Sequence, residues 1–226
     1  MKVNLQIDKK HSSVILGLTL RFARLKSGYS LRDMGELANI SHTLIGNVET
    51  GKTTASPETL RDLFVILGID YIDNDELITE FTRVYNRVFV NLFSYHYDRI
   101  VEDMIYLENN EQLYMNSIVM MDYSLLRYLH GVLTNNMTSY ILENLDLLKH
   151  ISSLLSPRQQ QLQHLIVGVD YFNQELYYDA FMELSKALKL GDPQCYPLIN
   201  LYIVRAQVKM FMFMDAYKNA EIIIEQ

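Results

Sequence analysis

The 226-residue sequence is poor in the residues that interrupt helices, with only nine glycines and four prolines. Hydrophobic residues make up 49% of it, which excludes a linker or a disordered tail and leaves enough material for a proper core. Leu, Met, Asn and Tyr are abundant. This composition favours an all-α protein with one large domain or two small ones.

Cysteine and long apolar runs are also scarce. The single Cys195 cannot form an internal disulfide, which is typical of proteins from a reducing compartment. No stretch approaches the roughly 18 uncharged apolar residues of a membrane span. Met1 is not followed by an apolar signal segment. We therefore expect a cytoplasmic protein that does not enter the membrane.

Patterns typical of catalytic or metal sites are missing from the sequence. The six histidines lack the tight spacings of metal ligands, and no nucleophile, base and oxyanion donor can be assembled. Cys195 has no basic neighbour to activate it. His96 is expected to pack within an apolar helix, and Glu102 and Asp103 to lie on a solvated face. We predict that the protein is not an enzyme and holds no metal or cofactor.

One phosphate-loop pattern is present, because GNVETGKT at residues 46–53 fits G-x-x-x-x-G-K-[ST]. A true phosphate loop follows a buried strand and opens a helix. Here the preceding residues, ANISHTLI, contain a helix cap, and Gly46 falls within the predicted helix. Pro57 interrupts the helix that should continue after Lys52. We interpret the match as accidental.

The net charge of −7 is unevenly distributed along the chain. Residues 1–62 contain nine Lys/Arg and six Asp/Glu, a net charge of +3, whereas residues 63–226 contain eleven and twenty-one, a net charge of −10. Only the N-terminal part is therefore suited to contact a polyanion such as nucleic acid.

Helix signals in the first seventy residues predict a series of short helices. Apolar residues recur at helical spacing over residues 13–26, and Gly28 is placed to end that helix. Ser30, with an acidic residue three positions later, begins a second helix. Asn39 follows it and tolerates a positive φ in the turn. Two further helices are expected after caps at Ser41 and Ser56.

Two short helices joined by a three- or four-residue turn form a helix-turn-helix. Spacing, caps and charges over residues 13–70 together resemble the Xre/Cro-type DNA-binding domain of phage and bacterial repressors. The resemblance implies a five-helix domain in which Arg24 on the first helix pairs with Glu49 at the end of the third. Three residues differ from the family's phosphate-binding glutamine, turn glycine and small polar residue: Leu31, Asn39 and Leu44.

The resemblance places the third helix in the major groove of DNA, with its N-terminal residues facing base edges. Asn47 can form a bidentate hydrogen bond to adenine, Thr43 can contact thymine, and His42 can donate or accept. Phosphate contacts, which set register and salt dependence, are expected from Arg21, Arg32, Lys52 and Thr53. The alternative is that these residues form an ordinary hydrated helix face.

Residues 71–226 are predicted to form a second helical domain. A long helix is expected after a cap at Asp73 or Asn74, with a break near Ser94. Two or more amphipathic helices should follow over residues 111–155, and another should start at Ser156.

The spacing of a tetratricopeptide repeat appears after Ser156, at Val167, Gly168, Tyr171, Ala180, Leu184 and Ala187. Ala216 and Ala220 predict a second copy over residues 197–226, and residues 111–155 could hold degenerate copies. Such repeats stack into a superhelix with a concave binding face. An unspecific helical bundle is the alternative.

An Xre-type domain joined to tetratricopeptide-like helices resembles the peptide-pheromone-sensing, quorum-sensing regulators of Gram-positive bacteria, the Rgg–NprR–PlcR–PrgX group. The resemblance implies a homodimer formed through the helical body and a short signalling peptide as effector. Candidates for holding the peptide are Tyr171, Asn173, Asn200 and Arg205. Each is equally suited to hydrogen bonding between helices, and a body that only dimerises is the alternative.

The sequence thus predicts a transcriptional regulator in which residues 1–70 bind a double-stranded DNA operator and residues 71–226 dimerise. A short peptide bound to residues 71–226 is a candidate for its control. The alternative is a helical-repeat interaction adaptor or antagonist without specific DNA binding, which Leu31 and Leu44 favour.

Overall fold

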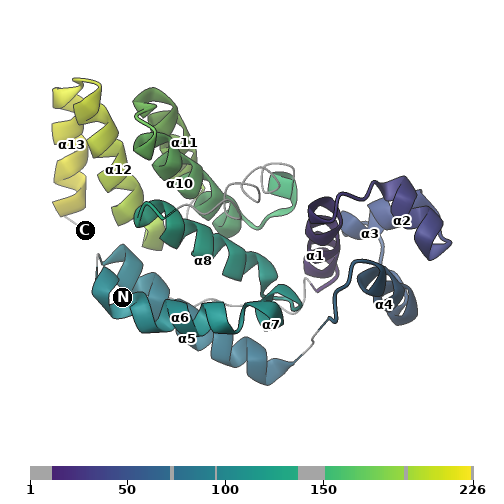
Figure 1. The fold of residues 1–226 in the computed structure, drawn as a ribbon. Helices are drawn as coiled ribbons and strands as arrows, with labels where there is room; N and C mark the ends of the chain where they lie inside the picture. The colour runs from purple at the N-terminus through teal and green to yellow at the C-terminus, as the bar shows by residue number, and fades with distance from the viewer. Residues whose placement is uncertain (1–11, 72–73, 95, 137–150, 191–192, 225–226) are drawn as a thin grey trace.

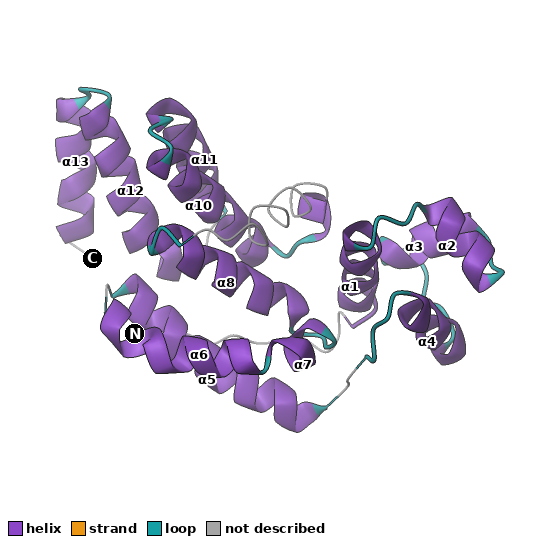
Figure 2. Cartoon of the chain, in the orientation of Figure 1, coloured by secondary structure: helices purple, strands orange, loops and turns teal. Residues whose placement is uncertain are grey.

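The protein folds as a chain of helices in two parts (Figure 1). The computed structural model describes residues 12–71, 74–94, 96–136, 151–190 and 193–224. Over these ranges the chain forms helices and connecting turns, with no β-strand (Figure 2). The all-α prediction is confirmed.

The N-terminal part, called the head (residues 12–71), contains four described helices: α1 (Ser12–Lys26), α2 (Leu31–Ala38), α3 (His42–Glu49) and α4 (Pro57–Ile66). The described part of the remainder, called the body (residues 74–224), contains α5 (Asp75–Phe93), α6 (Val101–Asn109), α7 (Glu111–Met115), α8 (Met120–Leu133), α10 (Pro157–Asn173), α11 (Tyr177–Lys189), α12 (Tyr196–Lys209) and α13 (Phe213–Ile224). Short 3-10 helices occupy Tyr97–Ile100, Ser152–Leu154 and Pro193–Cys195.

Helix ends in the head follow the predicted caps. Ser30 and Asp33 form a capping box, in which the Asp33 amide donates to Ser30 Oγ at 3.1 Å and the Ser30 amide donates to Asp33 Oδ2 at 2.8 Å. These hydrogen bonds lower the pKa of Asp33, the one to the Ser30 side chain contributing most. Asn39 takes the left-handed conformation with φ 55°, as its turn position predicted. Ser41 and Ser56 cap α3 and α4.

The head has its own apolar core, formed by Leu20, Met34, Ile45, Val48, Leu63 and Phe64. All four head helices contribute to it. Helix α5 belongs to the body, as predicted, because Phe81, Tyr85 and Phe89 on its buried face pack in the core of the body. The head thus has four helices within its described residues, and a fifth stays a prediction, since residues 1–11 lie outside the described residues.

Helix α1 contributes side chains to both cores. Leu20 is fully buried in the head core, whereas Leu18 and Phe22 are buried in the core of the body and Leu25 packs against it. Figure 1 shows α1 at the side of the head that faces the body. The head is therefore seated on the body through an apolar stripe of its first helix.

The first third of the body differs from the sequence interpretation at two residues. The long predicted helix ends at Phe93, close to the expected break near Ser94. His96 consequently lies outside the helix and is exposed, which corrects the expectation that it packs within an apolar helix. Asp103 is buried and accepts a hydrogen bond from Arg87 Nε on α5 at 2.6 Å, so the predicted solvated face is wrong at this position.

The last four described helices form two consecutive hairpins, α10–α11 and α12–α13. Ser156 and Gln159 form a capping box at the start of α10, where a helix start was predicted. A Cβ atom at Gly168 would lie only 2.7 Å from Leu184 Cγ, so the small residue permits close packing of α10 on α11. The tetratricopeptide assignment itself stays a prediction, and residues 137–150 of the possible degenerate copies lie outside the described residues.

Asp122 on α8 is a carboxyl group buried within the body. It is 9% exposed and accepts a hydrogen bond from Gln159 Nε2 at 3.3 Å. Burial raises its pKa to about 6, because the charged form loses hydration, and the Gln159 hydrogen bond and the Arg158 charge offset only part of this effect. The Arg158 guanidinium is stacked over the rings of Phe89 and Tyr85, at 5.0 and 5.8 Å from their centroids.

This group makes stability depend on pH. The folded-state pKa of Asp122 lies above the ordinary value of 3.8, so the protonated form of this carboxyl group favours the folded state. This contribution to stability is complete below pH 3.8 and is lost as the pH rises through 6. The shift corresponds to about 3 kcal/mol. Asp122→Asn, which cannot ionise, is expected to match the native protein near pH 4 and to exceed its stability by about 2–3 kcal/mol near pH 7.5.

Urea unfolding of both proteins at the two pH values measures this effect. Asp98→Asn, which removes a carboxylate at an exposed position, is the matched control. A stability difference between Asp122→Asn and the native protein that is the same at both pH values would contradict the expectation.

Candidate nucleic-acid interface

The turn between α2 and α3 holds the two helices close together. The Ile40 amide donates to the Gly35 carbonyl at 3.0 Å. A Cβ atom at Gly35 would lie 2.8 Å from the Ile40 carbonyl oxygen and 3.2 Å from the His42 amide nitrogen. Glycine at this position therefore lets the backbone of the turn lie directly against α2, which fixes the direction in which α3 leaves it.

Helix α3 has one buried face and one accessible edge. Ile45, Val48 and Glu49 are buried. His42 and Thr43 are exposed at its N-terminus, and Asn47, one turn after Thr43, is half-buried. The Ser41 hydroxyl accepts a hydrogen bond from the Thr43 amide at 3.2 Å, so the first turn is capped within the chain. The three predicted base-contacting residues thus lie on the part of α3 that the core leaves accessible.

The predicted phosphate-contacting residues flank α3 on several elements. Arg32 is exposed on α2, Lys52 is exposed after α3, and Thr53 beside it is half-buried. The Lys52 amide donates to the Asn47 carbonyl at 2.9 Å, which ties this loop to α3. Arg21 is half-buried on α1. Contact of these side chains with DNA stays a prediction.

A shallow hollow of about 400 Å³ joins α2 to the start of α3. Arg32 and His42, one from each predicted group, both line it. Glu36 and Asn39 line it too, and sequence reasoning missed them. The spacing of four residues from Arg32 to Glu36 places both on one helix face and was the available signal. The negative charge of Glu36 offsets the positive charge of Arg32 within this hollow. A high density of positive charge is therefore not the feature that distinguishes this surface.

Arg24 and Glu49 form a two-bond ion pair between α1 and the end of α3. Arg24 Nε lies 2.6 Å from Glu49 Oε1, and Nη2 lies 2.8 Å from Oε2. The side chains are 7% and 2% exposed. Arg24 Nη1 also donates to the Tyr29 carbonyl at 2.8 Å. The pair is thus removed from solvent and links α1 to the end of α3, as a structural pair would.

Two of the residues that differ from the family pattern pack inward. Leu31 and Leu44 are half-buried and pack against the head core. Leu31 Cδ1 lies 3.5 Å from where a Cβ atom of Gly46 would be, so it covers the middle of α3. Neither side chain offers a polar group to a phosphate or a base. Recognition at these two positions would have to come from their polar neighbours.

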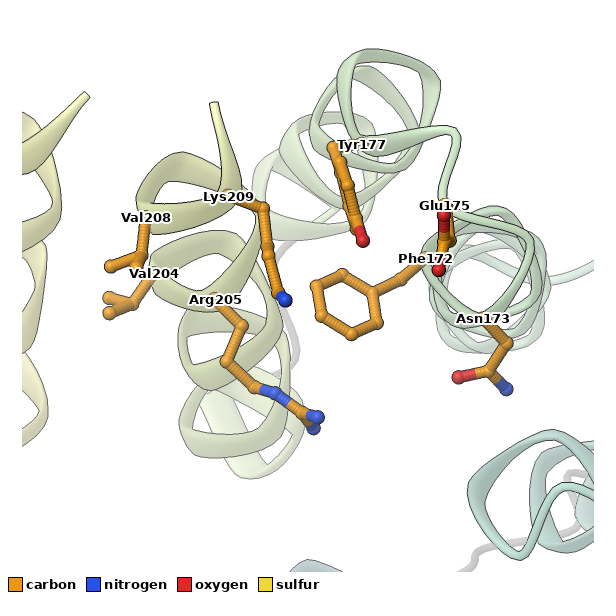
Figure 3. A pocket seen from close by; sticks show the side chains of 8 residues that line it. All are labelled: Phe172, Asn173, Glu175, Tyr177, Val204, Arg205, Val208 and Lys209. Atoms are coloured by element: carbon orange, nitrogen blue, oxygen red, sulfur yellow. The ribbon is translucent and has the colours of Figure 1, made fainter. Parts of the chain in front are cut away.

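The four residues predicted to hold a peptide are separated by the fold. A hollow of about 450 Å³ between α10, α11 and α12 is lined by Asn173 and Arg205 (Figure 3). Asn200 is only 7% exposed and does not line it, and its part in holding a peptide stays a prediction. Tyr171 packs against the body core and is likewise not part of the lining.

Asn173 and Arg205, the two predicted peptide-binding residues that line this hollow, already have partners within the chain. Asn173 Nδ2 donates to the Val132 carbonyl at 2.8 Å. The Arg205 guanidinium lies 4.7 Å from the centroid of the Phe172 ring and 4.8 Å from that of Tyr202. In Figure 3 the Arg205 and Lys209 side chains extend from α12 toward the Phe172 ring. The stacking preorganises a cation beside an aromatic surface.

Within the described ranges, no three His, Cys, Asp or Glu residues are grouped closely enough to hold a metal ion. Cys195 is buried. None of the helices described has the length and apolar character needed to cross a membrane.

One region of the chain matches a known protein family. The chain matches a family described as a helix-turn-helix domain over residues 15–77, which includes most of α1, all of α2 to α4 and the start of α5. No curated protein and no solved structure matches the chain. The N-terminal region is thus a helix-turn-helix domain, and it is followed by a helical region.

Proposed function

We propose that this protein is a cytoplasmic transcriptional regulator that binds double-stranded DNA by inserting the N-terminus of α3 into the major groove. The observation that carries the proposal is the placement of His42, Thr43 and Asn47 on the accessible edge of a helix whose other face is buried. Arg32 and Lys52 lie exposed before and after that helix, where phosphates pass on either side of a groove. The helix-turn-helix match over residues 15–77 supports the same surface.

The proposal includes a homodimer. One short recognition helix reads few base pairs, and two heads would read paired half-sites about 34–36 Å apart, or a multiple of that distance. The dimer would use the body, which holds the larger apolar core and seats the head through α1.

Control by a short peptide is a further part of the proposal. Its support is the hollow in Figure 3, where Arg205 and Lys209 lie beside the rings of Phe172 and Tyr177. A peptide carboxylate and an apolar side chain would both find complementary groups there. The hollow lies in the body, so such a peptide would act by changing how two heads are placed.

The DNA proposal is tested with an operator selected from a random DNA pool and with two substitutions. Asn47→Ala is expected to weaken binding to that operator by about 1–3 kcal/mol and to relax specificity at one base position. Lys52→Ala should weaken binding to all sequences alike and reduce the slope of log affinity against log salt by about one. Titration of labelled DNA at several salt concentrations measures both.

Lys189→Ala is the matched control, since Lys189 is exposed on α11 in the body. Its affinity and salt slope should equal those of the native protein. Failure to select any operator, or equal behaviour of all three variants, would reject groove binding and favour the interaction-adaptor alternative, in which Leu31 and Leu44 leave the head without its phosphate and base contacts.

A further inference from the structure

Helix α13 has one side packed on α12 and another side exposed. Ala216 is buried, and Asn219 Nδ2 donates to Gln207 Oε1 on α12 at 2.9 Å, so these residues mark the packed side. Figure 1 shows α13 beside α12, on the side away from α10 and α11. The exposed apolar residues of α13 and of the turn before it, called the α13 face, are Phe211, Phe213, Met214 and Tyr217.

The α13 face is one continuous surface. Phe213 and Tyr217 lie one helical turn apart, and Met214 lies three residues before Tyr217, so these side chains are neighbours on the helix. The ring of Phe211 meets that of Phe213 edge to face, with the centroids 6.0 Å apart. The turn and the first half of α13 therefore present their large apolar side chains together.

Phe211 has a backbone conformation that its side chain does not favour. Its φ of 62° lies in the left-handed region, which is unusual for a bulky residue and which glycine takes at Gly28, Gly51 and Gly68. Phe211 is also 79% exposed, so its ring gains little packing within the described part of the chain. A phenylalanine that is held in this conformation and turned to solvent is suited to being buried by a partner.

The α13 face has the size of a protein interface. Met214, Tyr217 and Phe213 are 72%, 63% and 58% exposed. At roughly 200 Å² for each large side chain, the face exposes roughly 500 Å². The exposed side chains of Val208 and Met212 adjoin Phe211 and enlarge it. A stable dimer buries about 800 Å² on each partner, so this surface supplies most of one half of such an interface.

The charges beside the α13 face match a second copy of the same surface. Lys218 and Glu221 are exposed on α13 and border the apolar residues on one side. A two-fold axis that crosses the helices pairs the same surface on both copies and makes the two α13 helices antiparallel. Lys218 then lies on the same side of the interface as the partner's Glu221, and this opposite-charge arrangement occurs twice.

We propose that the α13 face joins two copies of this chain, with α13 of one copy packed antiparallel on α13 of the other. This rests on the homodimer of the proposed function and names the surface that forms it. Figure 1 shows α13 and the head at opposite ends of the molecule. Dimerisation through the α13 face therefore leaves the candidate DNA-binding surface of both heads uncovered.

Sedimentation velocity of the full chain over about 1–100 μM measures the dimer. Tyr217→Asp and Met214→Asp each bring two carboxylates into the apolar interface, so the dissociation constant should rise at least about 100-fold. Both residues are exposed in the single chain, and thermal melts check that the variants fold. Tyr178→Asp is the matched control, because Tyr178 is 65% exposed on α11, and it should dissociate like the native protein.

A charge exchange tests the antiparallel arrangement. Lys218→Glu places a carboxylate on the side of the partner's Glu221, so the dimer should weaken about tenfold. Adding Glu221→Lys to the same chain restores opposite charges, and the dissociation constant should return close to the native value. Lys189→Glu, at an exposed position on α11, is the control for the change in net charge.

A dimer that both aspartate variants weaken, and that the charge exchange restores, supports the proposal. A dimer that neither aspartate variant weakens overturns the α13 face and leaves the homodimer of the proposed function to another surface. Weakening by Lys218→Glu that Glu221→Lys does not reverse overturns the antiparallel pairing. A chain that stays monomeric overturns the α13 face as a self-association surface and the homodimer together, whereas DNA binding by the head is decided by the operator titration alone.

Discussion

Glu49→Ala is expected to lower the free energy of unfolding of the head by about 3–5 kcal/mol, because it leaves a buried charge without its partner. Arg24 is 7% exposed on its side chain, and two of its hydrogen bonds end on the Glu49 carboxylate. The guanidinium would keep only the Tyr29 carbonyl among these partners. Hydrogen exchange in residues 15–66 measures the loss directly in the head.

A double substitution separates the unpaired charge from the loss of attraction. Arg24→Met combined with Glu49→Leu removes both charges and fills similar volume, so much of the lost stability should return. The exposed pair Glu80–Arg83, whose side chains are 39% and 59% exposed, is the matched control. Glu80→Ala should cost at most about 1 kcal/mol. Equal losses for Glu49→Ala and Glu80→Ala would show that burial of the head pair carries no energetic weight.

Gly17→Ala is expected to destabilise the head by about 3 kcal/mol, at the upper end of the usual cost of overpacking. A Cβ atom at Gly17 would lie 2.1 Å from the Val48 carbonyl oxygen, which belongs to the backbone of α3 and cannot rotate away as a side chain would. α1 and α3 must therefore separate. Chemical denaturation followed by hydrogen exchange in α3 measures the effect, and DNA affinity should fall with it.

Gly46→Ala is the matched control for this substitution. Its Cβ atom would meet only Leu31 Cδ1, at an ordinary contact distance of 3.5 Å. Because alanine is favoured over glycine within a helix by roughly 0.5–1 kcal/mol, this variant should be slightly more stable than the native protein. A loss of stability from Gly46→Ala as large as that from Gly17→Ala would contradict the packing explanation.

The helix ends could be predicted from the sequence because capping is local. Ser30, Ser41 and Ser156 each accept a hydrogen bond from an amide two or three residues ahead. Asn39 has a positive φ because its short polar side chain tolerates that conformation. Such interactions depend on a few neighbouring residues, so the starts of α2 to α5 and of α10 followed from residue types alone.

Contacts between distant segments could not be predicted in this way. An acidic residue on the polar side of a helix is expected to be solvated, but the chain turns after Phe93 and brings Asp103 against Arg87. Asn200 is buried because α12 has neighbours on several sides, α10, α11 and α13 among them. The same limit applies to the packing of α1 against the body, because Leu18 and Phe22 lie far in the sequence from the body residues whose core they share.

The candidate DNA-binding surface was predictable in part. The helical repeat turns Ile45 and Val48 inward, and this leaves Thr43 and Asn47 on the other side of α3. The hollow that Glu36 and Asn39 share with His42 depends on how α3 leaves α2, and that angle is set by the close backbone contact at Gly35. The angle between α2 and α3 cannot be predicted from a pattern of residue types.

The first helix places a constraint on how this architecture can be exchanged between proteins. Leu20 and Phe22 on α1 belong to different cores. A head transferred to an unrelated protein would expose the apolar side chains of α1 that pack against the body. An unrelated head joined to this body would leave a gap beside Met120. A chimaera in which both parts fold must therefore have its junction before α1, or must transfer α1 together with the surface of the body that it contacts.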